Sequence, residues 1–290
     1  MKPAPFEYFA PETAEEALAL MAEHGVEARP LAGGQSLVPL INMRMAQPSV
    51  LIDLNRCPEL AYLRGEDGML VSGPMTRQRE LELSETVRAA CPLIAKAMPY
   101  MGHATIRNRG TAGGSLSHAD PSAELPGVAL ALGAEMIAGG PNGRRTVPAT
   151  EFFFAELTTA LEPDEMLCEI RFPEAPAGSR AAFAEVGSHF GGLALVGVAA
   201  QIDLDSAGRC TKAALAATGA GERPTRLSST EAVLTGEVLE KQSIAEAAEA
   251  AAGDVEPLED LHATAHWRRR AAVAMAARVL HEIADEAGTR

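Results

Sequence analysis

The sequence feature that most constrains this chain is a pair of glycine doublets, one in LAGGQSL (31–37) and one in ATIRNRGTAGGSLSHADPSAELP (104–126). The longer stretch has no apolar periodicity that could hold a regular element through its middle, although patterned helical segments lie on both sides. Each doublet follows an extended segment and precedes a serine. Two loops that offer consecutive backbone N–H groups predict one extended, phosphate-bearing ligand between them.

The spacing of the two doublets excludes the common nucleotide motifs. Neither doublet has the GxGxxG pattern of a dinucleotide-binding βαβ unit, and neither is followed by the Lys and Ser/Thr of a Walker loop. The residues alone therefore disfavour a nicotinamide site and an ATPase.

Length and charge limit the classes of protein to which this chain can belong. A chain of 290 residues can bury a sizeable core and is expected to form two domains. The net charge of -14 argues against nucleic-acid binding, which needs a basic stripe. We expect a cytoplasmic protein without a membrane span, because no apolar run is long enough to cross a bilayer and the N-terminal residues lack a secretory signal.

The cysteines and histidines predict no metal site. Cys57, Cys91, Cys168 and Cys210 are far apart and show no CxxC pair, so we expect them to pack as small reduced side chains. His262 and His266 have the i, i+4 spacing of a zinc motif, but its glutamate is absent. The basic run at 266–270 is interpreted as a solvated helix face or a subunit contact.

Strands followed by helices predict an α+β organisation with a boundary in the linker-like run 173–178. We expect a first domain over 1–176 and a second over 177–290. The second domain is predicted to contain three strands and then helices, at 181–186, 193–204, 210–218, 228–234, 243–252 and 261–287.

Three runs, 31–60, 105–126 and 140–148, resemble the FAD-binding medium subunit of the molybdenum hydroxylase family, which includes aerobic carbon monoxide dehydrogenase and xanthine dehydrogenase. The resemblance covers essentially the whole chain. It implies an FAD-binding domain of two α/β lobes, of the vanillyl-alcohol-oxidase (PCMH) type, and a C-terminal domain with a three-stranded antiparallel sheet and helices. The FAD would lie between the lobes and against the second domain.

The resemblance also implies which residues contact FAD. The N–H groups of 32–36 and 111–115 would surround the pyrophosphate and ribityl groups. The implied cofactor-binding residues are Leu31, Ala32, Gly33, Gly34, Gln35, Ser36, Leu37, Met101, Thr111, Ala112, Gly113, Gly114, Ser115, Asp120, Glu124 and Leu167.

Several of these roles have ordinary alternatives. Asp120 could form an Asx turn or cap a helix, while Met101 and Leu167 could simply pack in the core. Arg107 and Arg109 have three open roles, namely phosphate binding, organising the loop through its carbonyl groups, and contact with a partner subunit.

The chain departs from its relatives in ways that leave the flavin potential and the electron acceptor open. Glu185 stands where some relatives place a lysine, and the run 188–195 is less basic than is usual. A separate departure, Ala112 in place of a larger β-branched residue, should only loosen packing.

The function implied by the resemblance is electron transfer. This chain would take electrons from a [2Fe–2S] cluster on a small partner subunit and pass them from FAD to an external acceptor, with no catalytic residue of its own. Substrate, whether carbon monoxide, a purine, a nicotine-like or another N-heteroaromatic compound, would react at a molybdopterin centre on a large partner subunit, in a dimer of heterotrimers. The alternatives are a self-contained FAD oxidase, disfavoured because no covalent-attachment motif is present, and a flavin-free scaffold, disfavoured by the two intact glycine loops.

Overall fold

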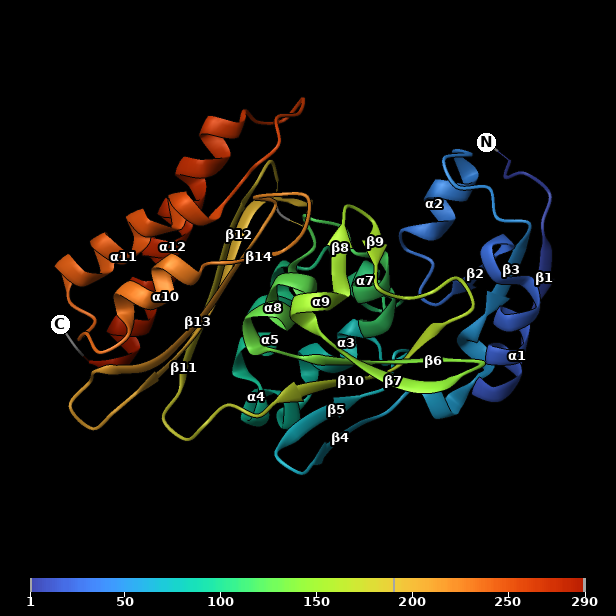
Figure 1. Cartoon of the computed structure of the whole chain (residues 1–290), viewed down its shortest axis with the longest axis horizontal. Helices are drawn as coiled ribbons and strands as arrows, with labels where there is room; N and C mark the ends of the chain where they lie inside the picture. The colour runs from blue at the N-terminus through green and yellow to red at the C-terminus, as the bar shows by residue number, and fades with distance from the viewer. Residues whose placement is uncertain (1, 190, 289–290) are drawn as a thin grey trace.

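The computed structural model describes residues 2–189 and 191–288. Three sheets follow one another across the molecule, from a small parallel sheet at the N-terminal end to an antiparallel sheet in the C-terminal part (Figure 1). Helices cover the sheets, so the chain is α+β as expected. Among the described residues, no helix is long and apolar enough to cross a membrane.

The first lobe is a parallel sheet in the order β1-β3-β2. Its strands end at the same edge, where Asn55 donates from Nδ2 to the carbonyl of Ala32 at 2.9 Å. Helix α1 begins after Thr13, whose Oγ1 accepts the N–H of Glu16. The lobe comprises β1 (Glu7–Phe9), α1 (Ala14–His24), η1 (Gly25–Glu27), β2 (Ala28–Leu31), α2 (Leu37–Asn42), β3 (Val50–Asp53), η2 (Leu54–Arg56) and η3 (Pro58–Leu60).

The second lobe is built on a five-stranded sheet in the order β4-β5-β10-β6-β7. Short helices cover it, and a two-stranded hairpin, β8 and β9, stands beside them (Figure 1). Its strands are β4 (Leu63–Glu66), β5 (Met69–Ser72), β6 (Glu135–Gly140), β7 (Gly143–Pro148), β8 (Phe153–Ala155), β9 (Thr158–Thr159) and β10 (Met166–Pro173). Its helices are α3 (Gln78–Leu83), α4 (Glu85–Ala90), α5 (Pro92–Ala97), η4 (Met98–Tyr100), α6 (Ala104–Arg107), α7 (Ala112–His118), α8 (Glu124–Leu132) and α9 (Ala149–Phe152).

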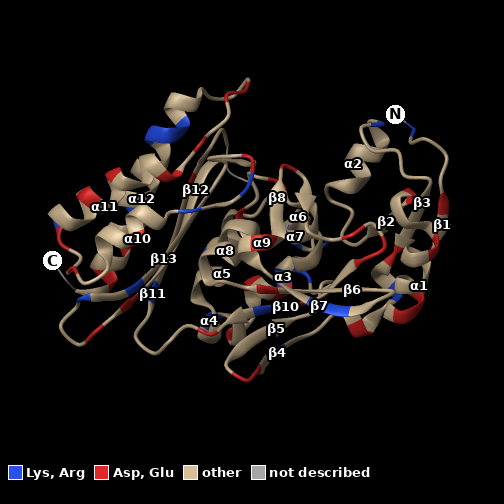
Figure 2. Cartoon of the chain, in the orientation of Figure 1, with Lys and Arg blue, Asp and Glu red and all other residues tan. Residues whose placement is uncertain are grey.

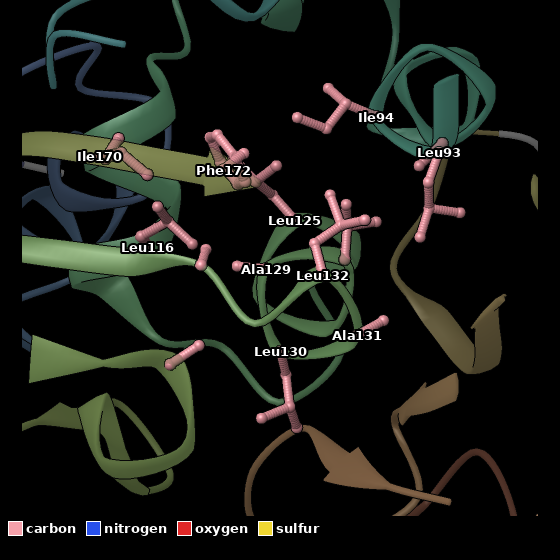
Figure 3. Packing of buried hydrophobic residues seen from close by; sticks show 14 of the residues in the cluster. Leu93, Ile94, Leu116, Leu125, Ala129, Leu130, Ala131, Leu132, Ile170 and Phe172 are labelled. Carbon is pink, nitrogen blue, oxygen red and sulfur yellow. The ribbon is translucent and has the colours of Figure 1, made fainter. Parts of the chain in front are cut away.

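Helix α8 is buried along its whole length, which makes it the centre of the core. Figure 3 shows Leu125 and Leu132 of this helix near Phe172 of β10 and Leu93 of α5. Burying one such side chain contributes roughly 1.5–3 kcal/mol. The same apolar cluster continues into the C-terminal sheet through Phe183, Ala199 and Ala216, so the two domains share one core.

The C-terminal domain is an antiparallel sheet with helices α10, α11 and α12 on one face (Figure 1). Helices α5 and α8 contact the other face, which explains why β12 is buried along most of its length. The three predicted strands are present, and the two-residue strand β14 extends the sheet to four. The elements are β11 (Arg180–Gly187), β12 (Ala194–Leu204), β13 (Cys210–Thr218), β14 (Thr225–Arg226), α10 (Ser228–Leu234), α11 (Lys241–Asp254) and α12 (Ala265–Ala287).

Polar contacts join the two domains at the C-terminal end of α8 and between α5 and α12. Arg226 donates from Nη1 to the carbonyls of Leu130 and Ala131, both at 3.0 Å, and thus satisfies the last turn of the helix. Lys96 of α5 pairs with Glu282 and Glu286 of α12. Figure 2 shows acidic residues on many elements, including α1 and the C-terminal helices.

The structure contradicts the expectation that 104–126 lacks a regular element through its middle. Helix α7 spans Ala112–His118, so the second glycine doublet lies in the first turn of a helix and not in a loop. Thr111 caps this helix, and Leu116 is completely buried. Periodicity missed α7 because the helix is short, contains two glycines, and is stabilised by packing against neighbouring elements and not by an amphipathic pattern.

The four cysteines are buried and free, as the packing interpretation predicted.

Candidate functional site

A cavity of about 690 Å³ lies between the first lobe, helix α7 and the β8–β9 hairpin. Its position at the carboxyl end of β2 is typical of ligand sites in parallel α/β units. The sequence candidates that line it are Ala32, Gly33, Gly34, Gln35, Ser36, Leu37, Thr111, Gly113, Gly114, Ser115, Asp120 and Leu167. Both glycine stretches therefore face one elongated space.

The first glycine loop presents free backbone donors. The N–H groups of Gly33, Gly34, Gln35 and Ser36 donate no hydrogen bond to any residue that the structure describes. Gly34 has φ of +74°, a conformation that favours glycine. Unpaired amides at the edge of a cavity are ready to bind an anion, because each would otherwise need water.

The second glycine stretch differs from the expectation, because its amides are already bonded. Ala112 and Gly113 donate to the carbonyls of Thr76 and Pro74, both at 2.9 Å. Gly114 and Ser115 donate to Oγ1 and the carbonyl of Thr111, at 3.0 and 3.1 Å. This wall can therefore offer side-chain hydroxyl groups and the positive end of a short helix, but not a set of free N–H groups.

Two cavity-facing hydroxyl groups remain available on that wall. The side chains of Ser115 and Ser117 line the cavity and have no hydrogen-bond partner among the described residues. They can donate to phosphate or ribityl oxygens without breaking an existing contact.

Four candidates lie outside this cavity. Leu31 lines a smaller cavity of about 440 Å³ on the glycine loop, while Ala112 and Met101 are buried in the core. Glu124 is 6 % exposed in the first turn of α8. Core packing, the ordinary alternative, therefore describes Met101 in this structure.

Sequence patterns did not indicate several other residues that line the cavity. They include Pro74, Gln78, Ile106, Leu157, Thr158, Leu161 and Leu193. These residues come from segments far apart in the chain, and only the tertiary fold brings them together. No local motif would have identified them.

Asp120 forms the Asx turn that was its ordinary alternative. Its Oδ1 accepts the N–H of Ser122 at 2.8 Å, which is an Asx turn, and the residue also lines the cavity. The turn fixes the carboxyl group at the cavity wall.

The β8–β9 hairpin joins the end of α7 through two residues in the left-handed region. Ala119 has φ of +51° and Leu157 has φ of +52°, and the N–H of Leu157 donates to the carbonyl of Ala119 at 3.1 Å. Such conformations are costly for residues other than glycine and often occur at functional sites. Here they turn the chain so that Leu157 faces the cavity.

Arg107 organises the loop through backbone carbonyls. Its Nη1 donates to the carbonyls of Met101 and Gly102, and its Nε and Nη2 pair with both carboxyl oxygens of Glu82, at 2.8 and 2.9 Å. The Arg107 guanidinium lowers the pKa of Glu82. Arg107 is buried and fully engaged, so phosphate binding is excluded for it in this structure.

Arg109 has a different environment. Its side chain is exposed and lines the smaller cavity together with Asp53 and Asn55, while its carbonyl accepts a bond from Arg77.

A pair of acidic residues, the buried Glu124 and the half-buried Glu185, lies where α8 meets the C-terminal sheet. Burial raises the pKa of Glu185 to about 8, and the negative charge of Glu124 adds to this effect. Burial likewise raises the pKa of Glu124 to about 7. Glu185 Oε2 has no hydrogen-bond partner among the described residues. Part of the departing run 188–195, Phe190, lies outside the described residues.

Comparison with known protein families identifies the class. A model described as the FAD binding domain in molybdopterin dehydrogenase matches residues 4–175, so the chain carries a flavin-binding domain. A second model, the CO dehydrogenase flavoprotein C-terminal domain, matches residues 181–283. The chain belongs to the family of flavoprotein medium subunits represented by carbon monoxide dehydrogenase.

Individual relatives align over nearly the full length. The chain is 39% identical over 280 residues to the 6-hydroxypseudooxynicotine dehydrogenase complex subunit alpha of Paenarthrobacter nicotinovorans, covering 97% of this chain and 95% of the relative. It is 37% identical to the caffeine dehydrogenase subunit beta of a Pseudomonas species, covering 98% and 97%. A solved structure of carbon monoxide dehydrogenase from Hydrogenophaga pseudoflava superposes with a TM-score of 0.94 at 39% identity, covering 98% of both chains.

Replacing Arg107 by Met should lower the free energy of unfolding by about 2–4 kcal/mol, because it leaves the partly buried carboxyl group of Glu82 without its bidentate partner. Urea unfolding of the full chain measures this loss. Arg79→Met is the matched control, since Arg79 pairs with the same carboxyl group but is 40% exposed. The control should lose less than about 1 kcal/mol. Equal losses in the two variants would contradict the role assigned to Arg107.

Glu185→Gln should stabilise the chain more at high pH than at low pH. The pKa of Glu185 is about 8 in the fold, against about 4.3 for an unperturbed glutamate. The wild-type chain therefore loses stability as pH rises between these values, whereas Gln stays neutral. Melting temperatures at about pH 5 and pH 8.5 should show the larger gain at the higher pH. Glu222→Gln, at an exposed position, is the control; a gain independent of pH at Glu185 would disprove the burial argument.

Proposed function

We propose that this chain is the FAD-carrying electron-transfer subunit of a molybdopterin-dependent dehydrogenase complex. The single observation that supports it most directly is the run of unpaired N–H groups at Gly33–Ser36 on the wall of a cavity whose volume suits a cofactor. The family membership of both domains agrees with this reading. In a flavin-free scaffold, these N–H groups would have no ligand to bind.

In the proposed binding mode, the two walls of the cavity contact different groups of FAD. The amides of the first glycine loop would bind the pyrophosphate, and the hydroxyl groups of Ser115 and Ser117 would bind neighbouring oxygens. Asp120, Leu167 and Leu193 would contact the remaining parts of the cofactor. When bound, FAD supplies the capacity to accept and release electrons, and this chain supplies position, exclusion of water and local charge.

The proposed partners are a small subunit with [2Fe–2S] clusters and a large subunit with the molybdopterin centre, arranged as a dimer of heterotrimers. Among the described residues, no group of three or more His, Cys, Asp or Glu side chains could hold a metal ion. The relatives are named for a nicotine derivative and for caffeine, although they share this chain's length and family. We therefore assign substrate choice to the large subunit.

Two further assignments complete the proposal. The domains are taken as 1–176 and 177–290, with the connection between β10 and β11 at the boundary. The complex is placed in the cytoplasm, where reduced cysteines persist.

Ser36→Asp should weaken FAD binding at least tenfold relative to Ser36→Asn. The two side chains have the same size, so the difference isolates a negative charge placed beside the phosphate-binding amides. Because Ser36 is exposed, neither variant should disturb the fold. Titration of the flavin-free chain with FAD, followed by flavin fluorescence, measures both dissociation constants. Equal affinities would mean that the pyrophosphate does not lie at this loop.

The purified chain should show flavin absorption bands that bleach when a chemical reductant is added. It should not reduce its flavin with any substrate of the complex unless the small and large subunits are present, because no molybdenum centre is proposed on this chain. Anaerobic absorption spectroscopy of the isolated chain and of the reconstituted complex tests both points. Reduction by substrate in the isolated chain would favour a self-contained oxidase, and a chain that cannot be reconstituted with FAD would refute the proposal.

A further inference from the structure

A buried cation of the C-terminal domain donates hydrogen bonds to two backbone segments that are connected to the cavity wall. Arg268 of α12 is 5 % exposed. Its Nη1 donates to the carbonyls of Leu195 at 2.5 Å and Gly219 at 2.9 Å, and its Nη2 pairs with Asp260 at 2.7 Å. The basic run 266–270 was expected to be a solvated face or a subunit contact, and for Arg268 the structure contradicts this.

We propose that Arg268 is a positioning residue that fixes the C-terminal domain's edge of the FAD cavity. This inference rests on the proposed function, since it concerns how the same cavity holds its cofactor. Arg268 does not line the cavity; it acts through the two backbone segments whose carbonyls it binds.

The first segment connects Arg268 to the cavity wall directly. Leu195 lies in β12, two residues after Leu193, which lines the cavity and is 62% exposed. A carbonyl held at Leu195 restricts the chain at the point where it leaves the sheet toward Leu193. The position of that apolar side chain therefore depends on the guanidinium.

The second segment connects Arg268 to the acidic turn. Gly219 follows β13, and its N–H donates to the carbonyl of Pro121 at 2.8 Å. Pro121 is next to Asp120, which lines the cavity. One guanidinium thus holds two C-terminal-domain segments: the Leu195 segment leads to Leu193 on the cavity wall, and the Gly219 segment contacts the acidic turn that carries Asp120.

The geometry around Gly219 shows how tightly these segments meet. Gly219 has φ of +68°, and a Cβ at this position would lie 2.3 Å from the carbonyl oxygen of Leu195. Two carbonyls that converge in a buried place need a shared donor. A planar guanidinium can serve both and still pair with a carboxylate, whereas a lysine ammonium lacks this fixed fork.

Asp260 orients the guanidinium from outside. Its Oδ1 accepts the N–H groups of His262 and Ala263, each at 2.9 Å, and its Oδ2 faces Arg268. These bonds hold the pKa of Asp260 down to about 2. The carboxylate of Asp260 is thus charged and held in place by backbone N–H groups, independently of Arg268. Its fixed position limits the number of conformations that the arginine can adopt.

The test uses the full-length chain reconstituted with FAD and compares Arg268→Met, Arg268→Lys and Asp260→Asn. Arg270→Met is the matched control, because Arg270 is exposed on the same helix. The readouts are the FAD dissociation constant, the visible circular dichroism of the bound flavin and its reduction potential. Far-UV circular dichroism follows folding independently. Only the flavin readouts separate positioning from a purely structural role.

We expect Arg268→Met to weaken FAD binding about tenfold and to change the visible circular dichroism and the potential. Arg268→Lys and Asp260→Asn should show smaller changes in the same direction, with wild-type far-UV spectra. If Arg268→Met does not fold, the flavin readouts of Arg268→Lys and Asp260→Asn test the proposal. Flavin spectra, potential and affinity equal to those of Arg270→Met would overturn the proposal while leaving the FAD assignment intact. A wild-type chain that binds no FAD would instead refute the proposed function itself.

Discussion

The close approach of two backbone segments is the constraint on which the cavity depends. A Cβ on Gly33 would lie 2.3 Å from the carbonyl oxygen of Arg109 and 2.8 Å from the Cα of Gly110. Gly113 makes a similar approach to Pro74. Gly33 therefore allows the first lobe to touch the α6–α7 region, and Gly113 allows α7 to pack against the segment that follows β5. Both glycines are needed for packing within the protein as well as by a ligand. Without that contact, the two glycine stretches would not face one space.

Helix α8 connects this region to the C-terminal domain through its packing. Its buried side chains join the second lobe to the C-terminal sheet, and Arg226 binds the carbonyls at its end. Gly127 allows the sheet to come near, since a Cβ there would meet Thr218 at 2.3 Å. The C-terminal domain is thus part of the same packed body, which explains how a residue as distant as Arg268 can influence the cavity.

The sequence predicted the architecture well where patterns are local. The β13 and α10 bounds coincide with those expected, because alternating or helical apolar spacing is visible in single segments. Helix α7 escaped prediction because its stability comes from contacts made by Leu116 and Thr111 and not from periodicity. The glycine doublets correctly indicated the cavity, but not which amides remain free, since Pro74 and Thr76, distant in the chain, decide that. The roles of Arg107 and Arg268 likewise depend on carbonyls that no motif identifies.

The difference between the two cavity walls affects the folding stability of the chain before FAD binds. One wall is complete in itself, since the amides of Ala112–Ser115 are bonded within the fold. On the other wall, the N–H groups of Gly33–Ser36 donate to no described residue and remain open to an anion. Any ligand that binds only the folded form shifts the folding equilibrium toward it. Binding of FAD at these amides should therefore stabilise the folded chain, so the cellular supply of flavin would influence how many newly made chains stay folded long enough to assemble.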